Sequence, residues 1–178
     1  GTIGSGPTVP DPTTLENARS ILKKYQINAS FQINQHLKQA KNETPKYESD
    51  IFKNTSVRFA ALPSTSLNAA ADFAKSVGVT PYLLGDDLEG EARKLGKEHA
   101  LLALRIKEGR EPIHPPCVIL SGGETTVTIK GNGRGGPNGE YALAMAINLK
   151  GEKNIFSLAC DSDGIDGSED NAGAIISP

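Results

Sequence analysis

The sequence has 178 residues with 19 basic and 21 acidic side chains, which gives a formal net charge of −2. A chain of this length can bury roughly two thirds of its unfolded surface, but its charge balance lacks the positive field that attracts nucleic acid or an anionic membrane. The first thirty residues show no basic region followed by an apolar run, and no stretch reaches the roughly 18 consecutive apolar residues of a membrane helix. We therefore expect a cytoplasmic protein that binds small polar molecules.

The first part of the chain predicts a loop followed by helices. Residues 1–14 are rich in Gly, Pro and Thr and have no periodicity, which indicates a loop. Thr13 with Glu16 three residues later has the pattern of a capping box, and it predicts a helix through about Gln26. A weaker helix is expected over 30–41. The polar residues 42–54 then form a connection, so we place a domain boundary between 1–54 and 55–178.

Beyond residue 55, short apolar runs alternate with helical patterns. We expect helices over 64–77, 90–107 and 138–149, and strands over 57–62, 80–84, 117–120, 125–130 and 155–160. Strands separated by amphipathic helices predict an α/β fold of three layers (α/β/α), in which helices cover both faces of a mostly parallel or mixed sheet. The short gap at 121–124 favours an antiparallel pair there.

A glycine-rich segment, Gly-Asn-Gly-Arg-Gly-Gly-Pro-Asn-Gly-Glu at 131–140, leads directly into an apolar helix. Glycines let backbone N–H groups approach an anion, and a helix amino end adds unpaired donors. Arg134 brings a planar cation suited to phosphate or carboxylate. The alternative is a flexible connection. We predict an anion site made by Gly133, Gly135, Gly136, Asn138 and Glu140 around the Arg134 side chain.

The same segment also satisfies G-x-G-x-x-G, the pattern of a dinucleotide-binding turn. That interpretation needs an opening βαβ unit and an acid after the next strand, a position that Asp161 could fill. Pro137 and the inserted Arg134 instead favour a loop wrapped on phosphate. No G-x-x-x-x-G-K-[ST] pattern occurs in the sequence, so a Walker-type phosphate loop is excluded within these 178 residues.

An acidic segment at 161–171 carries five carboxylates within ten residues, directly after a predicted strand. Carboxylate oxygens are ligands that magnesium prefers, so we predict Asp163 and Asp166 as metal ligands, with Asp163 also close to the chemistry. The spacing does not match an EF-hand. The alternative is a solvated turn in which Asp side chains accept hydrogen bonds from the backbone.

A third unusual loop, Ser-Gly-Gly-Glu at 121–124, ends an apolar run. Gly122 and Gly123 permit a tight turn, and we predict that they help bind substrate or phosphate. We predict Glu124 as a catalytic residue that could ligate metal, accept a substrate hydroxyl or orient Arg134; a plain surface role is the alternative. In parallel α/β sheets ligands bind beyond the carboxyl ends of strands. Because the three loops follow strands or precede helices, we expect them to form one site.

The cysteines and histidines give no sign of a further site. Cys117 and Cys160 both lie in apolar runs, which predicts buried free thiols, and no paired Cys/His spacing suggests zinc. His36, His99 and His114 are scattered, and we expect none of them to be catalytic.

Four segments, at 4–14, 121–128, 131–143 and 163–174, together resemble the glycerate 2-kinase family, whose carboxy-terminal portion is called the MOFRL domain and whose older label is hydroxypyruvate reductase. The resemblance implies magnesium-dependent transfer of the ATP γ-phosphoryl group to the 2-hydroxyl of D-glycerate. It also implies a cleft between an amino-terminal lobe, of which 1–54 would be the tail, and a lobe formed by 55–178. We expect this chain alone to be an inactive fragment.

By position, Arg134 resembles the family's active-site arginine, and its motif loops contain Glu124, Asn138, Glu140, Asp163 and Asp166. The chain departs from the family at Pro137 and Gly139, where Arg and Gln are common. Two alternatives stay open: an NAD(P)H-dependent hydroxypyruvate reductase and a non-catalytic anion-binding module. An oligomer is compatible with the sequence.

Overall fold

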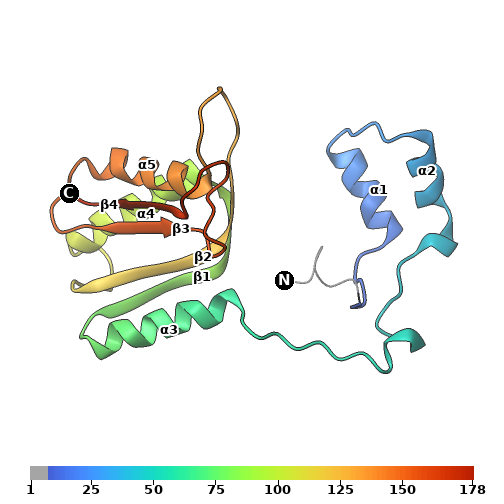
Figure 1. The fold of residues 1–178 in the computed structure, drawn as a ribbon, viewed down its shortest axis with the longest axis horizontal. Helices are drawn as coiled ribbons and strands as arrows, with labels where there is room; N and C mark the ends of the chain where they lie inside the picture. Colours follow the sequence, from blue (N-terminus) through green and yellow to red (C-terminus); the bar gives the residue numbers. More distant parts are fainter. Residues whose placement is uncertain (1–7) are drawn as a thin grey trace. The chain divides into compact units, whose positions relative to one another are not determined.

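The computed structural model describes residues 8–178 and divides the chain into two compact units, residues 1–60 and 61–178 (Figure 1). The division falls shortly after the polar connection predicted at 42–54. The first seven residues of the predicted opening loop lie outside the described residues. Each unit is considered by itself.

Unit 1 contains helices α1 (Leu15–Lys24) and α2 (Phe31–Lys38) and two single 3₁₀ turns, η1 (Ala40–Asn42) and η2 (Asp50–Phe52). The cap of α1 lies one residue later than predicted: Thr14 accepts a hydrogen bond from the Asn17 N–H and completes a capping box with the Asn17 side chain. Thr13 lies one residue before the N-cap position because the helix begins at Leu15, and its hydroxyl instead donates to Asp11 at 2.7 Å. The predicted capping box was therefore wrong in register, although the helix was correct.

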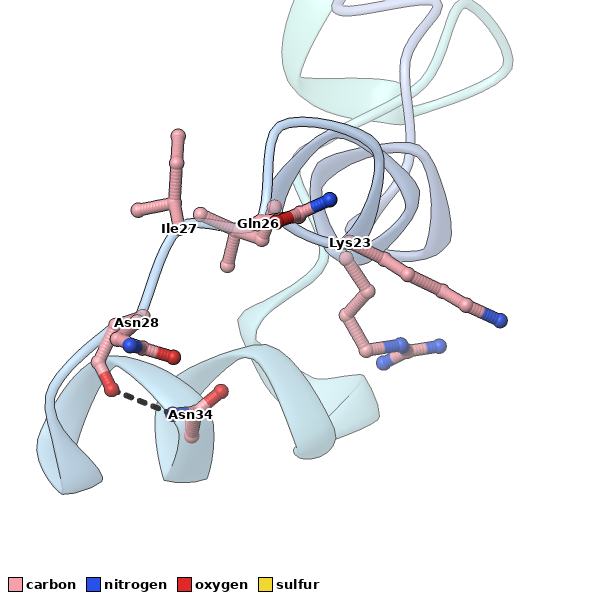
Figure 2. Close-up of a pocket in the computed structure, with 8 residues that line it drawn as sticks. Lys23, Gln26, Ile27, Asn28 and Asn34 are labelled. Atoms are coloured by element: carbon pink, nitrogen blue, oxygen red, sulfur yellow. Dashed lines mark hydrogen bonds between the residues drawn. The ribbon is translucent and has the colours of Figure 1, made fainter.

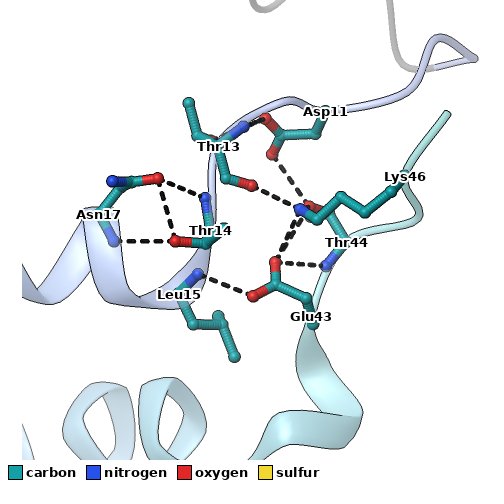
Figure 3. A network of polar contacts seen from close by, with 8 residues as sticks. All are labelled: Asp11, Thr13, Thr14, Leu15, Asn17, Glu43, Thr44 and Lys46. Carbon is teal, nitrogen blue, oxygen red and sulfur yellow. Dashed lines mark hydrogen bonds and ion pairs between the residues drawn. The ribbon is translucent and has the colours of Figure 1, made fainter.

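A polar network joins the segment before α1 to the segment after η1 (Figure 3). One Glu43 carboxylate oxygen accepts the Leu15 N–H at 3.0 Å, and the other accepts from Lys46 Nζ at 2.9 Å. Lys46 also donates to the Thr13 carbonyl at 2.5 Å. The hydrogen bond from the Leu15 N–H, and after it the one from Lys46 Nζ, lower the pKa of Glu43. The carboxylate thus supplies an acceptor for an α1 amide that has no partner within the helix.

The strand predicted over 57–62 does not form. Residues 55–62 have no regular structure before α3 begins at Pro63. A strand needs a partner for its backbone groups. The Val57 and Phe59 side chains that suggested the strand are 49% and 54% exposed. The apolar alternation therefore predicted a strand that has no neighbour among the described residues.

Unit 2 has the α/β fold that the sequence predicts, with its elements in the order α3 (Pro63–Ser76), β1 (Thr80–Glu91), α4 (Ala92–Lys107), β2 (Cys117–Thr126), α5 (Pro137–Leu149), β3 (Ser157–Cys160) and β4 (Gly173–Ile176). β1 and β2 are parallel, whereas β3 and β4 are antiparallel. Helix α3 lies on one side of the parallel pair and α4 and α5 lie on the other (Figure 1). The described residues form two two-stranded sheets rather than one continuous sheet.

The antiparallel pair predicted around residues 121–124 was wrong. β2 continues through this segment as one strand, and the residues after Thr126 leave the sheet. The reason is the close approach of β1: a Cβ added at Gly123 would lie 2.0 Å from the Leu88 carbonyl oxygen. The glycine thus allows two strands to run side by side through a register shift, instead of making a turn. β4 was not predicted at all.

The apolar core lies between α4 and α5, where Ala100, Met145 and Leu149 are buried. The helices come close because α4 has Gly96 at the contact: a Cβ there would lie 2.4 Å from the Tyr141 carbonyl oxygen. In the same contact, His99 Nδ1 and the Tyr141 hydroxyl are 2.7 Å apart. The His99 ring is thus buried with a polar partner in the contact between the two helices.

The two cysteines are free, as predicted, but only Cys117 is partly buried, and Cys160 is exposed at the end of β3. Cys160 follows the one buried residue of that short strand, Ala159, so the alternation of side chains turns it outward. Among the helices that the structure describes, none combines the length and apolar character needed to cross a membrane.

Candidate functional site

Two of the three predicted site loops meet at one edge of unit 2. The loop 127–136 follows β2 and leads into α5, and the acidic loop 161–172 follows β3 beside it (Figure 1). Backbone contacts join them, since the Ser168 N–H donates to the Gly135 carbonyl at 3.3 Å. The third segment, 121–124, lies within β2.

The amino end of α5 is occupied by a carboxylate of the protein itself. Asp166 is 2% exposed, and its Oδ1 and Oδ2 accept the backbone N–H groups of Asn138 and Gly139 at 2.9 and 2.8 Å. The Asn138 side-chain amide donates to the same carboxylate at 3.2 Å. A negative charge is stabilised there by the unpaired amides and by the helix dipole. Asp166 therefore takes the place that the sequence analysis gave to a bound anion.

The glycines of this region divide into two groups. A Cβ at Gly136 would lie 2.4 Å from Asp166 Oδ1, and one at Gly167 would lie 2.5 Å from the Gly135 carbonyl oxygen. These positions need glycine because the two loops touch backbone to backbone. Gly133, in contrast, faces open space with no atom within 4 Å. Only the tip of the predicted phosphate loop is thus free to approach a ligand.

Arg134 lies at this tip, and one of its three side-chain nitrogens is bound to Glu169. Its Nε donates to Glu169 Oε1 at 2.9 Å, while 77% of the arginine side chain is exposed. The Ser168 hydroxyl lies 3.1 Å from the same Glu169 oxygen and accepts the Gly135 N–H at 3.3 Å. No partner for the two terminal nitrogens of Arg134 is found in residues 8–178. A guanidinium held in this way can still bind an oxyanion with two parallel hydrogen bonds.

The acidic loop is held by hydrogen bonds from its own backbone amides. Asp163 is exposed, and its carboxylate accepts the Ile165 N–H at 2.9 Å in a local turn. Within the described part of the chain, no three His, Cys, Asp or Glu side chains gather as they would around a metal ion. Both Asp166 oxygens accept hydrogen bonds from α5 amides and only 2% of the residue is exposed, which disfavours Asp166 as a magnesium ligand; the pairing of Asp163 and Asp166 on magnesium stays a prediction. Of these two residues, Asp163 has the exposed carboxylate.

A different pocket, of about 440 Å³, lies between α1 and α2 of unit 1 (Figure 2). Its lining includes Arg19, Lys23, Gln26 and Asn34. The Asn34 amide donates to the Ala29 carbonyl at 2.8 Å, and Arg19 is paired with Glu16. None of the predicted site residues lines this pocket, so it does not enlarge the candidate site.

Comparison with known proteins agrees with the resemblance seen in the motifs. The MOFRL family model matches residues 117–178, and a model described as a domain of unknown function, DUF4147, matches residues 1–38. A crystal structure of glycerate kinase from Thermotoga maritima superimposes with a TM-score of 0.73 at 34% identity, covering 97% of this chain and 40% of that one. The chain belongs to the glycerate kinase family.

Curated relatives from this family carry two different names. A protein of Agrobacterium vitis named as a hydroxypyruvate reductase is 46% identical over 99% of this chain and 40% of its own length. A glycerate 2-kinase of Pyrococcus horikoshii is 38% identical over 98% of this chain and 40% of its own length. The chain thus spans about two fifths of the length of these glycerate kinase relatives.

The reductase name raises the question of whether the glycine loop can bind a dinucleotide. In that fingerprint a tight turn joins a strand directly to a helix whose amino end receives the pyrophosphate. Here residues 127–136 separate β2 from α5, and Asp166 already occupies the helix amino end. The loop in this member of the glycerate kinase family therefore lacks both features of the dinucleotide turn.

The other predicted site residues lie within β2 or the first turn of α5 and not in the two contacting loops. Glu124 is exposed and lies opposite Glu89 in the β1–β2 register, and the contact that orients Arg134 comes from Glu169 instead. Gly122 packs within β2 near the Asp86 backbone, and Glu140 is half-buried in the first turn of α5.

Sequence reasoning missed Glu169 and also Glu91, which anchors the start of the loop 127–136. Thr128 donates to Glu91 through both its hydroxyl, at 2.7 Å, and its N–H, at 3.1 Å. These two bonds, the hydroxyl first, lower the pKa of Glu91. A signal for Glu169 was present, because it is one of the five carboxylates of the acidic segment. Nothing in the spacing marked Glu91.

Proposed function

We propose that this chain is part of a kinase that transfers the γ-phosphoryl group of ATP to D-glycerate and gives 2-phosphoglycerate. The observation that carries the proposal is the Arg134 guanidinium, which is exposed at the loop tip with two nitrogens available. Relatives named as glycerate 2-kinases, at 35% and 38% identity, support the choice of reaction.

In this proposal the main task of the chain is positioning and charge stabilisation. Phosphoryl transfer places negative charge on the transferred group, and cations fixed beforehand supply much of the rate. Arg134 would bind an oxygen of that group or the glycerate carboxylate. An exposed arginine is well solvated, so a strong effect requires a second surface that excludes water from the site. The preceding lobe of the same protein is the proposed source of that surface.

Magnesium and ATP are part of the proposal. Magnesium usually keeps several waters and binds through one or two carboxylates together with phosphate oxygens, and it would neutralise phosphate charge. The exposed Asp163 carboxylate fits that mode better than Asp166, which is buried and accepts amide hydrogen bonds on both oxygens. We place the reaction in the cytoplasm, a setting that the two free cysteines support.

The alternative of an NAD(P)H-dependent hydroxypyruvate reductase is favoured by the name of the Agrobacterium vitis relative. The glycine loop disfavours this alternative, because residues 127–136 separate β2 from α5 and Asp166 occupies the amino end of α5. A non-catalytic anion-binding module would use the same Arg134 contact without turnover.

One pair of assays on the intact protein that contains this chain separates these functions. ADP release is followed with ATP, magnesium and D-glycerate, and loss of NADH or NADPH is followed with hydroxypyruvate. We expect ADP release that falls by about 100-fold or more in Arg134→Ala, because removal of one preorganised donor commonly costs that much. Arg110→Ala, which removes an exposed arginine paired with Glu108, serves as the matched control. Turnover only of the nicotinamide cofactor would overturn the kinase proposal.

A further inference from the structure

We infer that Glu169 is a positioning residue for Arg134: it accepts Nε and leaves the two terminal nitrogens directed at one oxyanion. The inference deepens the proposed function and rests on it for the identity of that anion. Its basis is the 2.9 Å contact between Arg134 Nε and Glu169 Oε1, which joins the acidic loop to the glycine loop.

Glu169 is itself held in place, which a positioning residue requires. Its side chain is 27% exposed, against 77% for Arg134. The Glu169 N–H donates to the Asp166 carbonyl at 3.2 Å, and the Ser168 hydroxyl lies 3.1 Å from Glu169 Oε1. Since the Asp166 carboxylate binds the amino end of α5, a continuous set of contacts runs from that helix to Arg134.

Arg134 needs such support because its own loop gives it little. Neither Gly131 nor Gly133 has a neighbour within 4 Å of where a Cβ would lie, so the segment around the arginine is not packed. A glycine-rich segment has high conformational freedom, and a long side chain on it loses much entropy when a ligand fixes it. A contact made before the ligand arrives lowers that cost of binding.

A plain surface ion pair would have a different consequence. Exposed pairs contribute only about 0–1 kcal/mol to stability. If Glu169 merely neutralised Arg134, its removal would leave a freer cation and strengthen anion binding. If Glu169 orients Arg134, its removal weakens anion binding although a negative charge is lost. The two interpretations therefore predict opposite signs.

The test is titration of the 178-residue chain with inorganic phosphate, followed by NMR at the Arg134 side-chain nitrogens. We expect Glu169→Ala to weaken the apparent phosphate affinity by about five-fold, because the entropic cost of ordering one long side chain returns. Glu169→Gln keeps an oxygen acceptor for Nε and should stay within about two-fold of the parent. Asp170→Ala, which removes an exposed neighbouring charge, is the control and should not weaken binding.

Phosphate binding by Glu169→Ala that equals or exceeds that of the parent would overturn the inference. Equal weakening by Asp170→Ala would also overturn it, because the effect would then not depend on the Nε contact. A second arm uses ADP release in the intact protein, where Glu169→Ala should lower kcat/KM in the parent but cause no further loss in Arg134→Ala. Weaker phosphate binding without any ADP release from the parent would reject the proposed kinase and leave the positioning role standing.

Discussion

Unit 1 and unit 2 differ in what stabilises them. None of residues 8–60 is buried, and the Tyr25 and Phe31 side chains of unit 1 are 63% and 73% exposed. Unit 2 has an apolar core between α4 and α5 and a glycine, Gly96, that lets these helices approach closely. Burial of apolar surface is the main favourable term in folding. Unit 1 therefore depends far more on its caps and on the network around Lys46.

The rigidity of the candidate site comes from the packed helices of unit 2. The glycine loop is not packed by apolar side chains, but it is tied through Asp166 to α5, and α5 is part of the core. A polar contact transmits order only when one of its partners is fixed. Unit 2 supplies that fixed partner, whereas the polar contacts of unit 1 join two exposed segments to each other.

The largest effect is expected from Gly136→Ala in unit 2. The new Cβ would lie 2.4 Å from the Asp166 carboxylate, so it should both clash and open the cap of α5. We expect a loss of about 3 kcal/mol in the free energy of unfolding, from the sum of overpacking and a lost cap. Denaturant unfolding measures it.

The matched control for that change is Gly133→Ala, which faces open space in the same loop. It should stay within about 0.5 kcal/mol of the parent. Equal losses in the two variants would contradict the close contact between the loops.

A smaller and local effect is expected in unit 1 from Lys46→Met. The change removes the bonds from Nζ to the Thr13 carbonyl and to Glu43, and so loosens the carboxylate that accepts the Leu15 N–H. Hydrogen exchange at the Leu15 amide should become roughly five-fold faster, the loss expected for about one net hydrogen bond. Lys53→Met is the control because its pair with Asp50 is 70% and 82% exposed. The same acceleration in both variants would show that the network around Lys46 has no special role.

The smallest effect is a pH dependence of unit 2 that comes from His99. Burial lowers the pKa of His99 below its ordinary value of 6.5, although the nearby Glu98 charge opposes the shift. The unfolded chain then binds more protons than the folded one just below pH 6.5, so stability should fall as the pH drops through that value. His99→Gln keeps a hydrogen-bond partner for Tyr141 and should remove this part of the pH dependence. Identical pH profiles of the two proteins would contradict the assignment.

The sequence predicted the helices of unit 2 well, because each has a long apolar period and a clear start. The segments expected at 64–77, 90–107 and 138–149 correspond to Pro63–Ser76, Ala92–Lys107 and Pro137–Leu149. Short strands were harder: 57–62 has the composition of a strand but no partner, and β4 has only four residues and opens with Gly173. Strand pairing depends on neighbours that are distant in the sequence.

From the sequence, the glycine and acidic segments both follow strands and were expected to lie together. The structure brings them into contact at one edge of unit 2, and their role as a site stays a prediction. The sequence does not indicate that Asp166 accepts amides from residues 138 and 139, or that Glu169 binds Arg134, because these contacts cross about thirty residues of intervening chain. Composition favoured Asp163 and Asp166 as metal ligands, and the structure adds that Asp166 binds the α5 amides and that Glu169 binds Arg134.

The contact between the glycine and acidic loops is tested most simply by the hydrogen exchange of four backbone amides in the unmodified chain. Asn138 and Gly139 donate to the buried Asp166 carboxylate, whereas Asn132 and Gly133 belong to the open tip of the loop. We predict that the first two exchange at least about 100-fold more slowly than the second two, because they open only when the contact between the loops opens. Equally fast exchange at all four amides would contradict the account, since the Asp166 carboxylate would then be free to serve another ligand.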